Sequence, residues 1–362
     1  MTRISYSYTP AGWTQEEFLR QGGFTVVFLN YNKARYIEKS VASALSQDYP
    51  ILEMFFMDDA STDGSGDEME RMVRQYRGRH KVSVVRNSAN QGITGQWNIV
   101  SKLATGVWFG MFCGDDVAHR DRVSIVAERI KKYPTLRGIS TAAVDIDIDT
   151  WKALPDSNYV PIPYLANGRD SWESLDANFN SNGSTSFWHK SLLDEPLPKV
   201  PLDDNFLHFK LLVMNRGVDG PIFFYDSSVK TIDYSIGAGI CGGGIVVDKS
   251  ASDRYRWVQE IVRYKCFLTK YVSTMRVSLG YARNKHVPQS CIAPFLCSHW
   301  WCKIRAGTTL MRIFMLPALV MTMIFVKVSL GRKASLLKAY LYYLTFEFFG
   351  VHFASFIRQF RF

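Results

Sequence analysis

The chain has 362 residues, of which 47% are hydrophobic and 21% are charged, and this composition is typical of a folded protein and excludes a disordered one. The formal net charge is +10, but residues 251–362 hold 17 Lys and Arg against 3 Asp and Glu, whereas residues 1–250 hold 26 against 30. The six cysteines lack paired spacing, which favours reduced thiols in a cytosolic setting, and residues 1–20 lack the apolar core of a secretory signal.

The first half of the chain alternates short apolar runs with amphipathic helical patterns, as an α/β protein does. The apolar runs predict strands at residues 24–29, 54–57, 82–85, 107–113 and 138–143. The helical patterns predict helices at residues 34–46, 66–76, 95–104 and 120–133. Such β–α–β units imply a mostly parallel sheet flanked by helices, with ligands at the carboxyl ends of the strands.

The pattern changes after residue 150. Residues 151–202 are rich in Pro, Asn, Ser and Gly and predict loops. From about residue 253 the pattern turns helical, and two apolar stretches lie at residues 313–326 and 339–357. The first is short for a membrane span, and the second is interrupted by Glu347 and His352.

The apolar stretches are rich in aromatic residues and flanked by Lys and Arg, which is typical of helices that lie in a membrane interface. We therefore predict a helical C-terminal region that associates with an anionic membrane surface. The alternatives are a helical subdomain that packs on the core and a true membrane span. Nucleic acid is not expected as a partner, because the aromatic residues are not interleaved with the basic ones.

Polar clusters follow the first two predicted strands where these strands end. The residues concerned are Asn30, Tyr31 and Asn32 after the first strand, and Asp58 and Asp59 after the second. Carboxylates at this edge of the sheet could accept hydrogen bonds from a nucleotide base or from ribose hydroxyls. The alternative is that the Asp and Ser residues of these turns only cap the helices that follow.

The strand predicted at residues 107–113 runs into Gly114, Asp115 and Asp116. Two adjacent carboxylates repel each other, and a bound divalent cation removes that repulsion. Mg²⁺ and Mn²⁺ prefer oxygen ligands and keep coordination positions open for substrate phosphates. The sequence therefore predicts a divalent metal at this turn, with an Asp-capped turn as the alternative.

Together these stretches resemble the family 2 glycosyltransferases. The resemblance covers roughly residues 24–240 and is carried by residues 25–32, 43–50, 58–63, 90–92 with 97–98, and 114–116. Each segment is a weak signal alone, but their order and spacing together are highly specific. The resemblance implies a GT-A fold and an inverting transfer of a sugar from a nucleotide-sugar donor.

The resemblance also implies roles for single residues. Tyr31 and Asp59 would hold the nucleotide base, with Asn30, Asn32 and Asp58 close by. Asp115 would lie near the ribose, and Asp116 would bind the metal, Mn²⁺ or Mg²⁺. The catalytic base of the family lies in an acidic pair that opens a later helix, and the pair Asp203–Asp204 matches that pattern. Asp204 is therefore the predicted base, with a helix cap as the alternative.

Two positions depart from the pattern of the family. Many members carry another Asp where this chain has Cys113, so that contact to the donor would be missing or moved to the backbone of Gly114. Similar proteins often carry Arg where this chain has Ser235, which puts one contact to the donor diphosphate in doubt.

The resemblance and the charge pattern predict three parts: an N-terminal extension at 1–22, a GT-A domain at 23–250 and the basic, aromatic-rich helical region at 251–362. Within the GT-A domain, residues 23–118 would bind the nucleotide and residues 119–250 the acceptor. A carboxylate that faces an imide N–H suits uracil or thymine, so UDP or dTDP is the favoured donor nucleotide, with guanine, which also offers an N–H, as the alternative base.

The predicted acceptor is a glycan or a lipid-linked glycan in bacterial surface polysaccharide synthesis, such as O-antigen or capsule. The predicted location is cytoplasmic and peripheral, on the inner face of the cell membrane. Two alternatives stay open: a sugar nucleotidyltransferase, and a non-catalytic nucleotide-sugar-binding protein on the same fold.

Overall fold

The computed structural model describes residues 2–147, 149–154, 164–167, 183–197, 207–208, 210–211 and 218–236. All of them lie in Met1–Val247, the first of two units into which the chain divides. The predicted boundary at residue 250 and the predicted C-terminal region therefore lie outside the described residues. Among the described residues, no helix has the length and apolar character that crossing a membrane requires.

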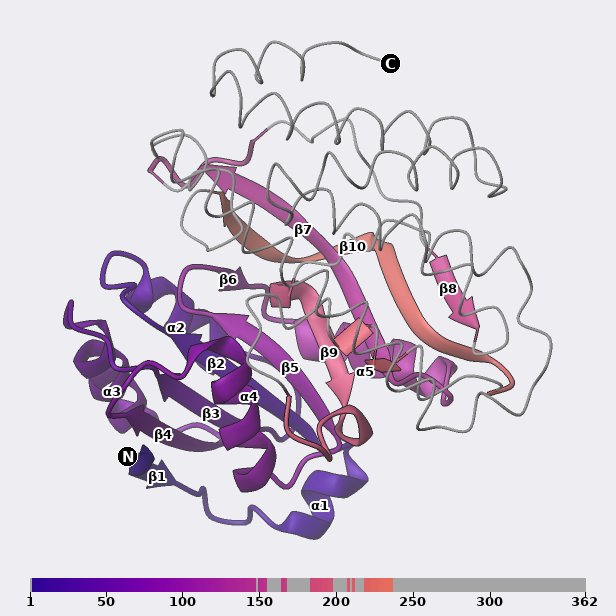
Figure 1. Cartoon of the computed structure of the whole chain (residues 1–362), viewed down its shortest axis with the longest axis horizontal. Coiled ribbons are helices and arrows are strands. Elements are labelled where there is room, and N and C mark those ends of the chain that lie inside the picture. The colour runs from indigo at the N-terminus through magenta and orange to yellow at the C-terminus, as the bar shows by residue number, and fades with distance from the viewer. Residues whose placement is uncertain are drawn as a thin grey trace, which may run out of the picture. The chain divides into compact units, whose positions relative to one another are not determined.

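The described elements alternate between strand and helix over the first 132 residues (Figure 1). The helices are α1 (Gln15–Arg20), α2 (Ile37–Leu45), α3 (Ser65–Gln75), α4 (Gly92–Leu103) and α5 (Arg122–Lys132), with short 3₁₀ turns at Gly183–Thr185 and Lys190–Leu192. The strands are β1 (Thr2–Tyr8), β2 (Phe24–Asn30), β3 (Glu53–Asp58), β4 (Lys81–Asn87), β5 (Trp108–Cys113), β6 (Val117–Ala118), β7 (Gly138–Asp147), β8 (Tyr164–Asn167), β9 (Ser186–His189) and β10 (Pro221–Ile236).

All five predicted strands and all four predicted helices are present, but two helices begin three residues away from the predicted position. Helix α2 begins at Ile37, after a turn in which the backbone N–H of Ala34 donates to the carboxylate of Asp63. Helix α4 begins at Gly92, because the carboxylate of Asp59 accepts the first backbone N–H groups. Carboxylates of the turn after β3 therefore accept backbone N–H groups at or just before the starts of both helices.

The sheet is mixed, which corrects the prediction of a mostly parallel sheet. Its order is β1-β4-β3-β2-β5-β9-β7-β10-β6, with β8 paired to β10. The central strands β4, β3, β2 and β5 are parallel, as is the pair β7 and β10. Strands β1 and β9 run antiparallel to their neighbours. Only parallel neighbours that follow each other in the chain need a helical crossover, so these two strands can join the sheet without one.

Five strands were not predicted, namely β1, β6, β8, β9 and β10. Strand β1 lies in the predicted N-terminal extension, 1–22, and pairs with β4. Strand β9 lies in the predicted loop region 151–202, yet its Phe187 and Trp188 are buried between β5 and β7. Its four residues are too few to show a periodic pattern. The longest of the five is β10, a 16-residue strand with irregular register against β7.

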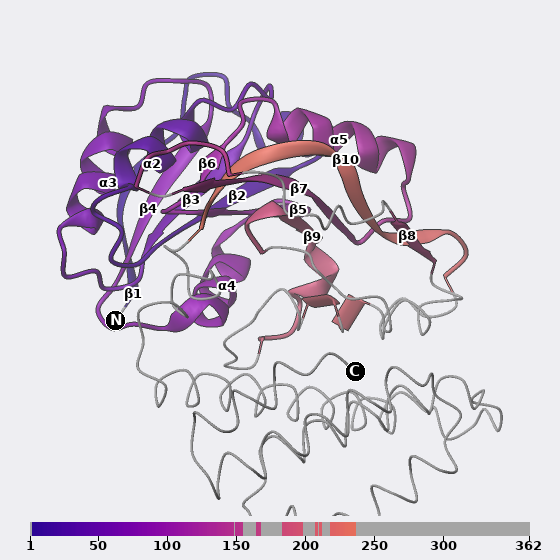
Figure 2. The ribbon, with the colours of Figure 1, turned by 90° about the horizontal axis from the view of Figure 1, so that it is seen from above.

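Helices cover both faces of the sheet (Figure 2). Helices α2, α3 and α5 lie on one face, and their apolar residues join one core cluster with Val26 and Phe28 of β2. Helix α4 lies on the opposite face, where its Trp97 contacts Phe109 of β5. Burial on both faces explains why the central strands read as continuous apolar runs. Because helices pack on both faces, the carboxyl ends of these strands are held in place at one edge of the sheet.

A buried histidine makes the stability of this domain depend on pH. His80 lies just before β4 and is 1% exposed, and one ring nitrogen, Nε2, lies 3.0 Å from the carbonyl of Gln47. Burial lowers the pKa of His80 to about 4, whereas an unfolded histidine has a pKa near 6.5. Between about pH 6.5 and pH 4, His80 therefore binds a proton in the unfolded chain but not in the folded chain. The free energy of unfolding consequently decreases as the pH falls from 6.5 towards 4.

We expect His80→Gln, which keeps a donor for Gln47 but does not titrate, to remove part of this dependence. The contribution is on the order of 2 kcal/mol between pH 7 and pH 4.5. Urea unfolding midpoints of both proteins at several pH values measure it, and the gap between them should change below pH 6.5. Equal pH profiles for the two proteins would contradict the assignment.

Candidate active site

The parallel register brings three polar strand ends together. Asn30 of β2 pairs with Asp58 of β3, and Leu29 pairs with Cys113 of β5. The turns after β2, β3 and β5 therefore open on the same edge of the sheet, as α/β sheets place their ligand sites. The predicted residues Asn30, Asp58, Asp59, Asp115 and Asp116 lie here and are all at most 6% exposed.

The turns after β2 and β3 form one hydrogen-bonded network. The side-chain amide of Asn30 donates to Asp58 at 2.9 Å and to the hydroxyl of Ser65 at 3.1 Å. The backbone N–H of Asn32 donates to the hydroxyl of Ser61, and the side-chain carbonyl of Asn32 accepts from the N–H of Thr62. Asn30 and Asn32 thus organise the site, and their predicted contact with a nucleotide stays a prediction.

Asp58 holds Asn30 in position through buried polar contacts. Its carboxylate accepts from Asn30 and forms an ion pair with Arg86 of β4 at 3.2 Å. The carboxylate also occupies the space next to Gly66 in α3, where an added Cβ would lie 2.6 Å from it. A glycine is therefore required at the second residue of this helix.

We expect Gly66→Ala to destabilise the domain by about 1–3 kcal/mol, because the new methyl group forces Asp58 away from Asn30 and Arg86. Thermal unfolding would measure the loss. The matched control is Gln75→Ala, an exposed position on the same helix that should change stability by less than about 0.5 kcal/mol. Equal melting temperatures for both variants would show that Asp58 moves without loss.

Asp59 connects β3 with the start of α4. Its Oδ1 accepts from the amide of Asn87 and from the N–H of Gln91, and its Oδ2 accepts from the N–H of Gly92. A carboxylate has about four acceptor positions, so one position on Oδ2 remains for a further donor. Tyr31 follows Asn30 at the same edge and is 45% exposed, which leaves its ring accessible to a flat ligand.

The turn after β5 is fixed by a strand that is distant in sequence. The backbone N–H of Ser235 in β10 donates to Oδ1 of Asp116 at 3.0 Å, and the hydroxyl of Ser235 donates to the carbonyl of Asp115. Asp115 forms an ion pair with Lys33 at 2.7 Å. Ser235, one of the two positions that depart from the family pattern, thus holds residues 114–116, the acidic turn, in place.

The charge of Asp116 is only partly compensated, by hydrogen bonds from Ser184 and Ser235 and by the positive charge of Lys33. Burial, followed by the negative charge of Asp115, raises the pKa of Asp116 to about 7. Its Oδ2 is buried and has no hydrogen-bond partner in the part of the chain that the structure describes. Asp116 therefore holds a buried carboxylate oxygen that a cation could bind.

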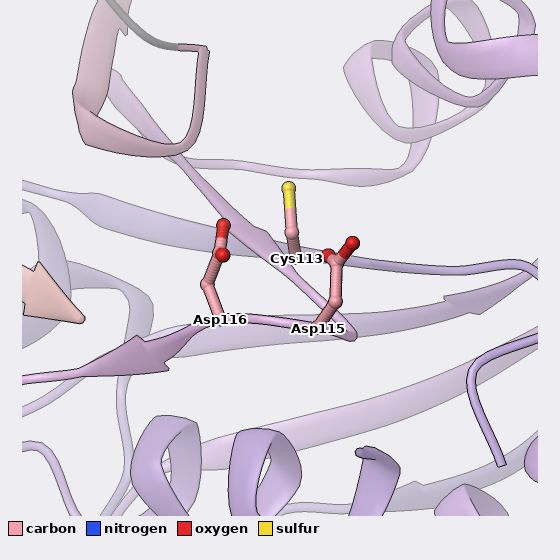
Figure 3. Close-up of side chains that lie close together, drawn as sticks. All are labelled: Cys113, Asp115 and Asp116. Atoms are coloured by element: carbon pink, nitrogen blue, oxygen red, sulfur yellow. The ribbon is translucent and has the colours of Figure 1, made fainter. Parts of the chain in front are cut away.

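Cys113, Asp115 and Asp116 bring their ligand atoms within 4.8 Å of one another (Figure 3). Two carboxylates and a thiol are ligands that divalent transition metals accept, and the buried oxygen of Asp116 lacks another partner. The residues at this turn therefore fit a divalent cation. The predicted base Asp204, and its neighbour Asp203, lie outside the described residues.

Two further charged residues lie at the site and were not predicted. Lys33 pairs with Asp115, and Arg122 at the start of α5 is buried over the rings of Phe112 at 4.2 Å and Phe187 at 5.0 Å. Burial lowers the pKa of Arg122 to about 9, and the charges of Cys113 and Asp116 oppose this shift. Lys33 adjoins a predicted motif and could have been considered, whereas nothing in the sequence marks Arg122 as buried.

Residues 25–187, from β2 into β9, match the family described as glycosyl transferase family 2. The chain is 32% identical over 104 residues to an uncharacterized glycosyltransferase of Nostoc sp., and 30% identical over 146 residues to chondroitin synthase of Escherichia coli. These alignments cover 29% and 40% of this chain, but only 31% and 21% of those two proteins. The chain thus matches less than a third of the length of either relative.

The fold is similar to that of a solved structure. The crystal structure of S. aureus TarS in complex with UDP-GlcNAc matches with a TM-score of 0.50, over 90% of this chain and 91% of that chain. The sequence identity is 16%, so this likeness concerns the fold alone.

Proposed function

Since residues 25–187 form a family 2 glycosyltransferase domain, we propose that the chain moves a sugar from a nucleotide-sugar donor to an acceptor hydroxyl, with inversion and with the help of a metal. The observation that carries the proposal is the acidic turn at the carboxyl edge of the parallel strands. There Asp116 is held by Ser235 and keeps a buried oxygen that has no partner among the described residues.

The donor nucleotide would lie across the ends of β2 and β3. Tyr31 is exposed beside this edge and would stack on the base, since aromatic rings pack on flat π-systems. The remaining acceptor position of Asp59 would take the imide N–H of uracil or thymine, which favours UDP or dTDP. The network of Asn30, Asn32 and Asp58 keeps both residues in place.

Asp116 and Asp115 would hold the divalent metal, Mn²⁺ or Mg²⁺. A metal bound there would neutralise the negative charge that grows on the diphosphate leaving group. Lys33 lies beside the same turn and holds one oxygen of Asp115, which leaves the other oxygen for the ribose or the metal. The orientation of both carboxylates is fixed before any ligand binds, which reduces the reorganisation that transfer requires.

Asp204 would act as the general base on the acceptor. Its carboxylate would take the proton of the acceptor hydroxyl while that oxygen attacks the anomeric carbon and the bond to the diphosphate breaks. One displacement inverts the anomeric configuration and needs only one such carboxylate. A glycan acceptor is proposed because one relative is a chondroitin synthase.

A thermal-shift panel of UDP, dTDP, GDP and CMP, each with Mn²⁺ and with EDTA, tests the donor site. A ligand at a hundred times its dissociation constant adds about 2.7 kcal/mol of stability. We expect UDP or dTDP to raise the melting temperature with Mn²⁺ and to have little effect with EDTA. Stabilisation by none of the four nucleotides would favour a protein without donor binding, and equal shifts with EDTA would exclude the metal.

We also propose that residues 251–362 bind an anionic membrane surface, where a lipid-linked acceptor would lie, which makes the enzyme peripheral on the inner face of the membrane. The support is their charge, with 17 Lys and Arg against 3 Asp and Glu. Each basic side chain near such a surface contributes about 1 kcal/mol, so replacing Arg332, Lys333 and Lys338 with Gln should weaken binding roughly a hundredfold.

Co-sedimentation of the full chain with anionic and with neutral vesicles measures this effect. The matched control replaces Lys102, Lys131 and Lys132, three exposed lysines of the catalytic domain, with Gln. Equal loss in both triple variants would show that the total charge of the chain, and not its C-terminal region, decides binding.

A further inference from the structure

The side chain of Cys113 lies close to the two carboxylates of the acidic turn. It is the last residue of β5, and its sulfur accepts a hydrogen bond from the hydroxyl of Ser184 at 3.1 Å. Figure 3 shows the sulfur between the carboxylates of Asp115 and Asp116, on the side to which the Asp116 carboxylate also points. The thiol therefore occupies the position where a third ligand to a metal at this turn would lie.

The spacing of the three side chains suits a common ligand. Their ligand atoms lie within 4.8 Å of one another. A sulfur and an oxygen bound to one metal, at about 2.3 Å and 2.1 Å, lie roughly 3.5 Å apart in tetrahedral geometry. Side-chain rotations that bring the ligand atoms about 1 Å closer together would reach this separation. The buried Oδ2 of Asp116, which has no partner within the described part of the chain, points independently to a bound cation.

The charges at the turn also favour a third anionic ligand. Asp115 is paired with Lys33 at 2.7 Å, and Asp116 lines the same small space as the guanidinium of Arg122. The two positive side chains thus offset part of the negative charge of the two carboxylates. A thiolate at Cys113 would add a further negative charge, and negative charge attracts a divalent cation to a buried site.

We propose that Cys113 is the third protein ligand of the metal site, and that it shifts the preference of the site from Mg²⁺ towards thiophilic cations such as Zn²⁺ and Co²⁺. The proposal rests on the proposed function, because Asp115 and Asp116 are shared with the donor site. On binding, the S–H bond gives its proton to solvent and the sulfur donates an electron pair to the metal. Thiolate ligands favour soft cations, whereas carboxylates and water suit Mg²⁺.

Titration of the full chain with Co²⁺ alone tests the proposal, because a cobalt–thiolate bond produces a charge-transfer absorption that oxygen ligands do not produce. We expect a band equivalent to one thiolate per chain, lost in Cys113→Ser and kept in the matched control Cys241→Ser. Competition with Zn²⁺ should show that Cys113→Ser weakens Zn²⁺ binding at least about tenfold. The variant Cys113→Asp should bind Mg²⁺ more tightly than the wild-type chain.

The outcomes separate this proposal from the proposed function. A missing cobalt band, or one that persists in Cys113→Ser, overturns the role of Cys113 even if UDP or dTDP with Mn²⁺ still stabilises the protein. A cobalt band that depends on Cys113, without stabilisation by any nucleotide, supports the thiol ligand and overturns the donor site. Circular dichroism of Cys113→Ser and Cys113→Asp establishes that both variants are folded.

Discussion

Replacing Asp116 with asparagine should abolish sugar transfer and at the same time stabilise the metal-free protein. Asparagine keeps an oxygen that accepts the N–H of Ser235, but it removes a negative charge that is 5% exposed and lies beside Asp115. At pH 8 this charge is present in the wild-type chain and is opposed by burial, so its removal should add about 2 kcal/mol of stability.

The same change removes the buried oxygen ligand of the metal. Metal stabilisation of a leaving diphosphate contributes several kcal/mol, so transfer should fall by at least about a thousandfold. Melting curves in EDTA and in Mn²⁺ measure the two effects together. In EDTA the variant should melt above the wild-type chain, and Mn²⁺ should raise only the melting temperature of the wild-type chain.

The matched control is Asp67→Asn, which changes the same chemical group where the side chain is 84% exposed. It should leave metal response, transfer and melting temperature nearly unchanged, because a surface ion pair contributes little. Normal transfer by Asp116→Asn would refute the metal site. Lower stability of Asp116→Asn in EDTA would mean that the buried charge has a compensating partner.

Replacing Asp204 with asparagine should remove transfer and leave donor binding intact. A general base typically contributes about 10²–10⁴-fold to a rate, and the isosteric amide cannot take the proton of the acceptor hydroxyl. The expected result is a loss of transfer in that range, with the same nucleotide-dependent rise in melting temperature as the wild-type chain.

Asp203→Asn is the control for this prediction, since it changes the neighbouring carboxylate of the same pair. It should retain most of the transfer rate. If Asp203→Asn loses transfer and Asp204→Asn does not, the two roles are exchanged. If neither variant loses transfer, the pair only caps a helix and the base lies elsewhere.

The central part of the fold follows from the pattern of apolar residues alone. The apolar runs that became β2, β3, β4 and β5 are buried on both faces, so their composition alone marks them as strands of a parallel sheet. The polar residues that follow them had to meet at one edge, because parallel strands end on the same side. The structure places Asn30, Asp58, Asp59, Asp115 and Asp116 at this edge, and their roles in binding stay predictions.

The contacts that hold the site were decided only by the tertiary structure. Ser235 fixes the acidic turn from 119 residues away, and Lys33 reaches Asp115 across 82 residues. No local pattern encodes such a contact, because it depends on which strands become neighbours. The burial of Arg122 and the mixed direction of the sheet have the same origin, since chain packing and strand order, rather than residue type, decide both.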